Sequence, residues 1–181
     1  KYKGRHYVLA KEALPRWFKE EGTFEIVDSF LGKALLGKNY LPLFPYFAHY
    51  ASEGAFKIIT DDFVSTEEGT GIVHTAPAFG EADFYACKKA GIPLVCPVDN
   101  NGRFAQEISE YAGLFVKDAD KDIIGRLKEN ERLFYRGTIH HRYPFCWRSD
   151  TPLIYKVITT WFVEVEKLKP EMIKANETIH W

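Results

Sequence analysis

The 181-residue chain has few cysteines and almost no net charge, and each shortage excludes a class of protein. A formal net charge of −1 provides no global basic field, so a polyanionic partner would need a local basic patch. No apolar run approaches the length of a membrane span. The three cysteines are too few and too irregular for a disulfide framework, which favours a reducing, cytoplasmic compartment: Cys87, Cys96 and Cys146.

Several catalytic signatures are also missing. There is no Gly-x-Ser-x-Gly motif, no Ser/His/Asp ordering and no convincing cysteine nucleophile, so a covalent hydrolase mechanism has no support. The stretch 69–71 (GTG) lacks both the spacing of a dinucleotide loop and the Lys-Ser/Thr of a P-loop. Cys146 has no paired cysteine, and the adjacent His140 and His141 would face opposite sides of a strand. We therefore predict no metal site and no nucleotide cofactor.

The remaining composition is that of a globular protein. Hydrophobic residues make up 46% of the chain, charged residues 27% and aromatic residues 15%, which argues against disorder. The length suits one domain with a substantial core. The chain begins at Lys1 without an initiator Met and stops abruptly at Trp181, so we expect a domain excised from a larger protein.

Apolar residues at i, i+3 and i+4, with glycine stops and charged end turns, predict four helices. Asp118 is the expected N-cap of the third helix. The second helix has acidic residues in its first turn and lysines in its last, as the helix dipole favours. The predicted helices cover 11–21, 81–90, 119–130 and 167–176.

Short β-branched and aromatic runs, separated by glycine and proline turns, predict many short strands. A turn is expected at 99–102 and another around 146–148. We predict a single α/β domain over residues 1–181, strand-rich and barrel-like, with several peripheral helices. The predicted strands cover 7–10, 24–30, 56–60, 63–64, 71–75, 94–98, 133–135, 139–142, 153–157 and 161–165.

The segment 69–83 (GTGIVHTAPAFGEAD) is the strongest candidate for a binding site. It predicts a strand, a glycine-containing turn and a helix start, a joint at which a ligand can approach the backbone closely. Asp83 falls in the first turn of the helix, where a carboxylate has a structural role and is also a natural receptor for an ammonium group. His74, at the end of the strand, is either a hydrogen-bonded rim residue or part of the site.

A second candidate is the basic and aromatic segment 140–148. Side chains of these two kinds together can stack on nucleotides and contact phosphate, although an aromatic core edge is an equally good reading. The residues expected to contact RNA are His141, Arg142, Trp147 and Arg148.

The segment 69–83 resembles the signature of the editing domain inserted in isoleucyl-tRNA synthetases, which are class I aminoacyl-tRNA synthetases. The segment 146–155 (CWRSDTPLIY) resembles a second family motif, and further segments match the family in order, so the resemblance covers nearly the whole chain. Those further segments are 95–99, 116–120 and 179–181.

This resemblance implies that the domain hydrolyses the ester of mischarged valyl-tRNA(Ile). By similarity, Asp83 binds the α-ammonium of the misattached amino acid and His74 lines the side-chain pocket that excludes isoleucine. Water attacks the ester, positioned by the protein and the terminal ribose, so neither a protein nucleophile nor an editing cofactor is implied. ATP and Mg belong to the parent enzyme's synthetic site, outside this chain. The implied partners are the 3′ CCA end of tRNA(Ile) and the rest of the parent synthetase. The other implied substrate-binding residues are Gly69, Thr70, Gly71, Thr75, Ala76, Phe79 and Gly80.

The family's editing site also uses a threonine-rich strand that is not found in this chain, and Thr159 and Thr160 are in the wrong order and context for it. We expect that strand to lie upstream of this chain, which would leave its isolated activity low. Three alternatives follow: a valyl-type editing domain acting on threonyl-tRNA(Val), a non-catalytic module that docks the tRNA 3′ end, and a small-molecule enzyme unrelated to tRNA.

Overall fold

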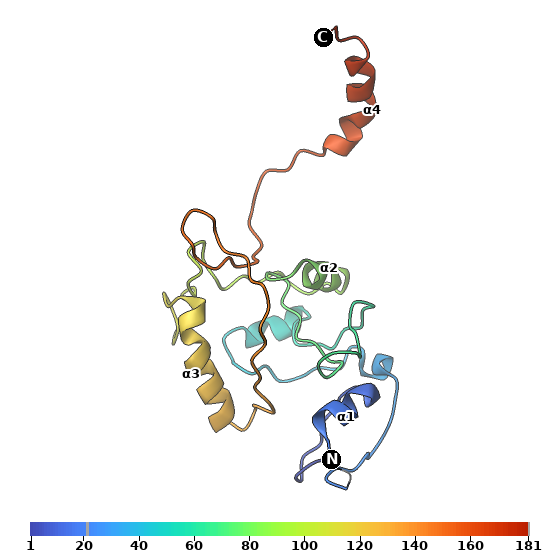
Figure 1. The fold of residues 1–181 in the computed structure, drawn as a ribbon, viewed down its shortest axis with the longest axis vertical. Coiled ribbons are helices and arrows are strands. Elements are labelled where there is room, and N and C mark those ends of the chain that lie inside the picture. The colour runs from blue at the N-terminus through green and yellow to red at the C-terminus, as the bar shows by residue number, and fades with distance from the viewer. Residues whose placement is uncertain (21, 181) are drawn as a thin grey trace.

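A computed structural model describes residues 1–20 and 22–180 (Figure 1). Glu21, the expected end of the first helix, and Trp181, the end of the closing motif, lie outside the described residues. Helical turns alternate with long irregular segments along the chain. In order, the elements are η1 (Lys11–Ala13), α1 (Leu14–Trp17), η2 (Gly32–Leu35), η3 (Ala48–Glu53), α2 (Glu81–Lys89), α3 (Val116–Glu129) and α4 (Val165–Asn176).

Three of the four predicted helices are confirmed with small shifts at their ends. Helix α2 has Glu81 and Asp83 in its first turn and two lysines in its last, as expected. Helix α3 begins three residues earlier than predicted, because Phe115 takes the extended N-cap conformation and places Asp118 inside the first turn. The prediction that Asp118 is the N-cap is therefore wrong, although its carboxylate still lies where the helix dipole favours it.

The first predicted helix is much shorter than its apolar spacing suggested. One 3₁₀ turn leads into α1, which ends at Trp17 because Phe18 adopts extended dihedral angles (φ −126°, ψ 91°). Phe18 instead packs its ring against Tyr2 and Phe24, at centroid distances of 5.1 and 5.0 Å. Aromatic packing across the chain thus ends the helix before the glycine stop.

The prediction of a strand-rich, barrel-like α/β domain is wrong for the described residues. Each of the ten segments predicted as strands runs as irregular or extended chain, except that the last residue of 161–165 already belongs to α4. Within 1–20 and 22–180, β pairing is limited to isolated bridges such as Asn39 with Lys57 and Val98 with Phe104. Residue composition sets only the tendency to be extended, whereas a ladder also needs a neighbouring chain in register. The described residues supply few such neighbours.

The buried core is small. Among residues 1–20 and 22–180, eight hydrophobic residues are buried, four of which are alanines, and the total accessible surface is 15163 Å². A compact monomer of this mass would expose only about 9,000 Å². Much of the apolar surface of the chain is therefore uncovered in this conformation.

The best-packed part of the core lies beside α3. Ile108, Tyr111 and Ala119 are buried there, with Phe104 and Ile123 packed against them. The Tyr111 hydroxyl donates to the Asp122 carboxylate at 2.5 Å and accepts from the Arg126 guanidinium at 3.1 Å. The predicted turn at 99–102 precedes this region in the chain and is confirmed, because the Gly102 N–H donates to the Asp99 carbonyl at 3.2 Å.

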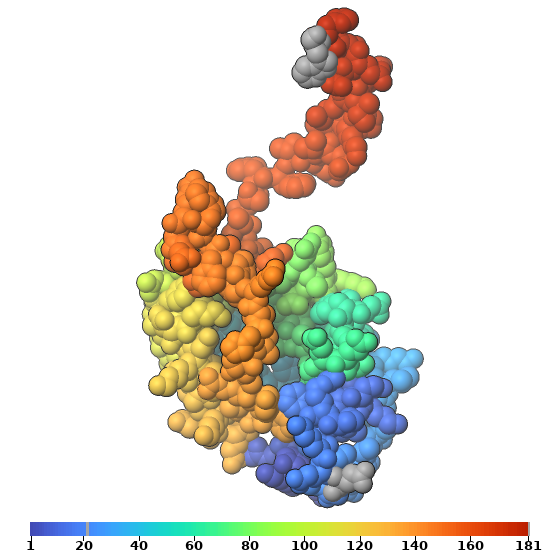
Figure 2. Space-filling view, in the orientation of Figure 1, coloured from blue at the N-terminus to red at the C-terminus, as the bar shows by residue number. Residues whose placement is uncertain are grey.

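The last residues leave the body of the molecule. Figures 1 and 2 show the chain after about residue 157 running outward to α4, away from the other helices. Among the described elements, only η1 and α1 contact each other closely. None of the helices in the described ranges is both long and apolar enough to cross a membrane.

Candidate functional site

The turn before α2 is built around Asp83. One oxygen of its carboxylate, Oδ2, accepts the Ala76 backbone N–H at 3.1 Å, and the Phe79 N–H closes the turn onto the Ala76 carbonyl at 3.0 Å. A Cβ on Gly80 would lie 3.0 Å from the same Oδ2, so only glycine fits without moving the carboxylate. Ala76, Gly80 and Asp83 therefore form one local unit, which fixes the direction of the carboxylate.

The surroundings of Asp83 leave its charge without a neutralising partner. The side chain is half-buried, and its only hydrogen bond to another described residue is the one from Ala76. One helical turn later, burial and then the charge of Asp83 raise the pKa of the Cys87 thiol. Burial, and next the nearby Cys87, also raise the pKa of Tyr40. Asp83 thus presents an oriented carboxylate that forms no ion pair with another described residue, which suits a cationic ligand.

His74 is not joined to this unit. Its side chain is exposed on the irregular segment that leads into the turn, and no hydrogen bond between described residues connects it to Asp83. Thr75 and Phe79 are half-buried in the same stretch. The structure therefore brings Ala76, Gly80 and Asp83 together and leaves His74 facing solvent.

Gly71, the second glycine of the segment 69–71, has a packing role that sequence reasoning missed. Gly71 has a left-handed backbone (φ +75°), and a Cβ there would lie 2.5 Å from the Ala10 Cβ. The Ala10 N–H donates to the Thr70 carbonyl at 2.8 Å. The Gly69 carbonyl accepts from the Arg16 guanidinium at 2.7 Å and the Trp17 indole N–H at 2.9 Å. Side chains from α1 thus clamp the start of the motif.

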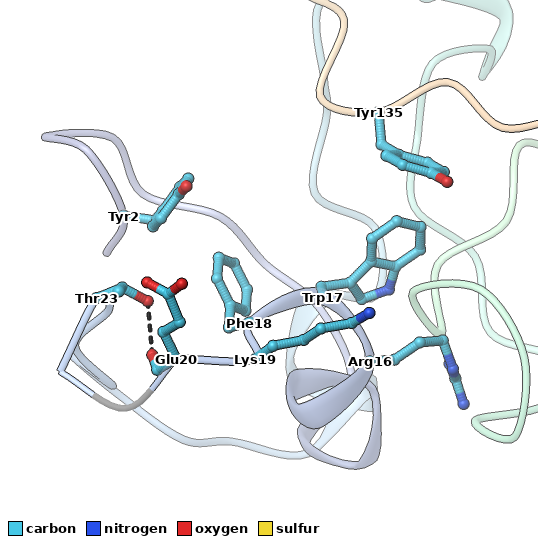
Figure 3. Close-up of a pocket in the computed structure, with 8 residues that line it drawn as sticks. All are labelled: Tyr2, Arg16, Trp17, Phe18, Lys19, Glu20, Thr23 and Tyr135. Atoms are coloured by element: carbon cyan, nitrogen blue, oxygen red, sulfur yellow. Dashed lines mark hydrogen bonds between the residues drawn. The ribbon is translucent and has the colours of Figure 1, made fainter.

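A cavity of about 590 Å³ lies beside this clamp (Figure 3). Its aromatic walls pack partly on one another, since the Trp17 and Tyr135 rings are edge-to-face with centroids 5.0 Å apart. No residue of 69–83 lines this cavity. Sequence reasoning missed it, although the run of aromatic and charged residues at 16–20 was a visible signal. The lining residues are Tyr2, Arg16, Trp17, Phe18, Lys19, Glu20, Thr23 and Tyr135.

The second candidate segment forms a tight hairpin. The Cys146 N–H bonds the Thr151 carbonyl at 2.8 Å, the Asp150 N–H bonds the Cys146 carbonyl at 2.9 Å, and Phe145 bridges to Pro152. The turn predicted at 146–148 is therefore confirmed. At its tip Trp147 is 85% exposed, and the Arg148 guanidinium lies 4.6 Å from the centre of its ring.

The other residues expected to contact RNA lie on the chain leading into this hairpin. His141 and Arg142 are exposed, and the Nδ1 atom of His141 lies 2.9 Å from the Arg142 carbonyl oxygen. These exposed aromatic and basic groups are of the kinds that can stack on a base and contact phosphate. All four residues are accessible to a ligand, and the hairpin holds Trp147 and Arg148 together.

Cys146 differs from Cys87 in the direction in which the pKa of its thiol is shifted. Hydrogen bonds from the Ser149 hydroxyl, and then from the backbone N–H groups of Ser149 and Arg148, lower the pKa of its thiol. Free Cys87, by contrast, is buried with a raised pKa. Cys146 is therefore the more readily ionised of the two thiols.

Comparison with known proteins gives strong similarity over the whole length. The chain is 62% identical over 177 residues to an isoleucine–tRNA ligase of Protochlamydia amoebophila, covering 98% of this chain and 17% of that protein. It is 55% identical over 181 residues to the isoleucine–tRNA ligases of Chlamydia trachomatis serovar L2 and Chlamydia caviae, covering all of this chain and 18% and 17% of those proteins. The chain thus spans less than a fifth of the length of these curated relatives. No family model matches the chain.

Proposed function

This chain belongs to the isoleucine–tRNA ligase family, as one segment of a class I aminoacyl-tRNA synthetase, and we propose that the segment edits mischarged tRNA. Its substrate would be valyl-tRNA(Ile), presented through the 3′ CCA end. The parent enzyme would charge tRNA(Ile) with isoleucine in the cytoplasm, using ATP and Mg at a synthetic site outside this chain. No cofactor is assigned to the editing step.

The need for such a step follows from the small difference between the two amino acids. Isoleucine exceeds valine by one methylene, which is worth only about 1–3 kcal/mol in a binding pocket, a range for which this enzyme family is itself the standard example. A synthetic site that accepts isoleucine therefore also accepts some valine. A second, smaller site that hydrolyses valyl-tRNA removes those errors.

The observation that carries the proposal is the oriented, unneutralised carboxylate of Asp83 at the start of α2. In the proposed reaction this group holds the α-ammonium of the valyl moiety. A water oxygen forms a bond to the ester carbonyl carbon, and the bond to the ribose oxygen breaks. The products are valine and tRNA with a free terminal hydroxyl, so no covalent enzyme intermediate is involved. The catalytic contribution is positioning.

The direct test measures deacylation by the full-length synthetase. Valyl-tRNA(Ile) should be hydrolysed much faster than isoleucyl-tRNA(Ile), and threonyl-tRNA(Val) should not be a preferred substrate. Faster hydrolysis of threonyl-tRNA(Val) would instead support a valyl-type editing domain. The identity of 52–62% to proteins named isoleucine–tRNA ligase favours the isoleucyl specificity.

A second candidate function is docking of the tRNA 3′ end without hydrolysis. The pairing of Arg148 with the exposed face of Trp147 favours it, because stacking on a base and contact with phosphate need these two groups together. Under this alternative, full-length Trp147→Ala would weaken tRNA binding, while no variant of Asp83 would change deacylation.

We expect His74→Ala in the full-length synthetase to loosen the selectivity of editing. By similarity the imidazole excludes the longer side chain of isoleucine, so its removal should raise hydrolysis of cognate isoleucyl-tRNA(Ile) by roughly tenfold or more, since one methylene is worth about 1–3 kcal/mol. The measurement is the rate of deacylation of isoleucyl-tRNA(Ile) against valyl-tRNA(Ile). Continued protection of the cognate tRNA would make the exposed His74 a simple surface residue.

We also expect the 181-residue chain alone to be a poor deacylase. His74 is exposed and Asp83 is only half-buried, so these two groups do not enclose the ester and the attacking water. Poor positioning alone costs on the order of 100-fold in rate. Single-turnover hydrolysis of valyl-tRNA(Ile) by the chain and by the full-length enzyme gives the comparison. Equal rates would show that residues 1–181 contain the complete site.

A further inference from the structure

The C-terminal arm, residues 158–180, presents the most exposed apolar surface of the molecule. Figure 2 shows it extending from the body of the molecule. Trp161 is 100% exposed and Phe162 is 86% exposed. Side chains of this size are rarely left fully in water, and several together mark an interaction surface. The other apolar residues of the arm, all about half exposed or more, are Ile158, Val163, Val165, Leu168, Met172, Ile173 and Ile179.

The first part of the arm has the composition of a strand without a strand partner. Residues 158–163 (ITTWFV) are β-branched or aromatic, which favours a pleated, half-buried strand. The last backbone hydrogen bond to the body is the one from the Val157 N–H to the Ala78 carbonyl, at 2.8 Å. Within the described ranges, residues 158–162 make no backbone–backbone hydrogen bond. Their N–H and C=O groups are therefore available to pair with a sheet edge.

The second part of the arm is an amphipathic helix with an uncovered stripe. Val165, Leu168 and Met172 follow the spacing i, i+3, i+7 on α4, and no other described helix packs against it. Four of the charged residues pair within the arm, in the contacts of Lys167 with Glu164 at 2.7 Å and of Lys169 with Glu166 at 3.7 Å. A helix of 12 residues gains most of its stability by burying such a stripe.

We propose that the C-terminal arm docks on the part of the parent synthetase that lies outside this chain, with residues 158–163 added as a strand to a β-sheet edge there and the apolar stripe of α4 packed beside it. The matched relatives are more than five times as long as this chain, since it spans 17–18% of their length, so a large folded body is available as the partner. A second copy of this chain is a poorer occupant. Its described residues offer only isolated bridges and no sheet edge, and an isolated two-stranded ribbon is marginal in water.

This inference rests on family membership and on the exposed arm, and it does not depend on the editing chemistry. Its test is hydrogen exchange of the full-length synthetase, followed by mass spectrometry of peptides that cover 158–164. We expect these amides to exchange at least about 100-fold more slowly than free peptide, because sheet pairing would protect them. Light scattering on the same sample should give a monomer. Unprotected amides in the monomeric enzyme would overturn the proposal, and so would protection that appears only with dimerisation.

A matched pair of variants tests the helix. Leu168→Asn removes an apolar group from the stripe, whereas Lys169→Asn makes the same substitution at the next, charged position, whose exposed ion pair contributes little. In the full-length enzyme, Leu168→Asn should raise exchange across 158–176 at least about tenfold, and Lys169→Asn should leave it unchanged. Equal effects of the two variants would contradict docking through the stripe. Deacylation of valyl-tRNA(Ile) by the unsubstituted full-length enzyme, measured in parallel, separates the two proposals. If that enzyme showed no deacylation while its arm was protected from exchange, only the editing function would be contradicted.

Discussion

Asp83→Ala in the full-length synthetase should abolish deacylation of valyl-tRNA(Ile), lowering its rate at least about 100-fold, and leave isoleucine activation intact. The substitution removes the proposed receptor for the substrate ammonium and also the acceptor of the Ala76 N–H. Without both, the ester is no longer held in line with the attacking water. Single-turnover hydrolysis of valyl-tRNA(Ile) and isoleucine-dependent pyrophosphate exchange measure the two activities.

Two further variants separate the charge of Asp83 from its structural role. Asp83→Asn keeps an oxygen that can accept the Ala76 N–H but removes the negative charge, so it should lose nearly as much deacylation as alanine. Glu81→Ala removes another acidic residue from the same first turn of α2, where the side chain is exposed, and should leave editing within about twofold of the wild type. Full activity of Asp83→Asn would assign Asp83 to shaping the turn alone. Unchanged deacylation by Asp83→Ala would exclude it from the site.

Gly71→Ala should loosen the clamp between the motif and the N-terminal segment far more than Gly69→Ala does. Both glycines have left-handed backbones, at φ +75° and +57°, so each substitution costs about 1–2 kcal/mol in backbone strain. Only at Gly71 would the new Cβ also lie 2.5 Å from the Ala10 Cβ, and relieving that overlap costs about 1–3 kcal/mol more. Gly69 has open space around it, which makes Gly69→Ala the matched control.

The Ala10 amide is a direct reporter of this clamp, because its N–H donates to the Thr70 carbonyl at 2.8 Å. Its hydrogen exchange in the full-length synthetase should be roughly 5- to 150-fold faster in Gly71→Ala than in Gly69→Ala, as the difference of about 1–3 kcal/mol requires. Similar exchange in both variants would mean that Ala10 moves away at no cost. Glycine would then be required in the Gly-Thr-Gly stretch only for its left-handed backbone conformation, and not for close packing against Ala10.

The helices were the part of the fold that local sequence signals could predict. Helix α2 combines an acidic first turn, a basic last turn and a following glycine, all within 11 residues, and it forms where predicted. Helix α3 was found by its apolar face, and only its start was misplaced, since Phe115 adopted the capping conformation. The failure at α1 has a non-local cause, because Phe18 leaves the helix to pack on Tyr2 and Phe24.

In the candidate site, too, some features could be predicted from the local sequence and others depend on distant contacts. The acidic residue in the first turn of a helix after a glycine turn was readable from 69–83, and the structure places Asp83 there. The contacts that hold the motif were not readable, because Arg16 and Trp17 lie more than 50 positions away from Gly69 along the chain. Likewise, the role of Gly71 depends on the approach of Ala10, which no local pattern encodes.

The sequence alone determined the family, the three longer helices and the position of Asp83 at a helix start, because motifs, capping and helical periodicity are properties of neighbouring residues. Only the tertiary structure decided which extended segments pair, and it left those of this chain nearly without partners. A strand needs hydrogen bonds from a second segment, and an apolar stripe needs a surface to cover it. In the C-terminal arm, where Trp161 is fully exposed, the extended segment lacks such hydrogen bonds and the helix stripe lacks such a surface among the described residues. This is the physical reason why we place the partner of the arm in the rest of the synthetase.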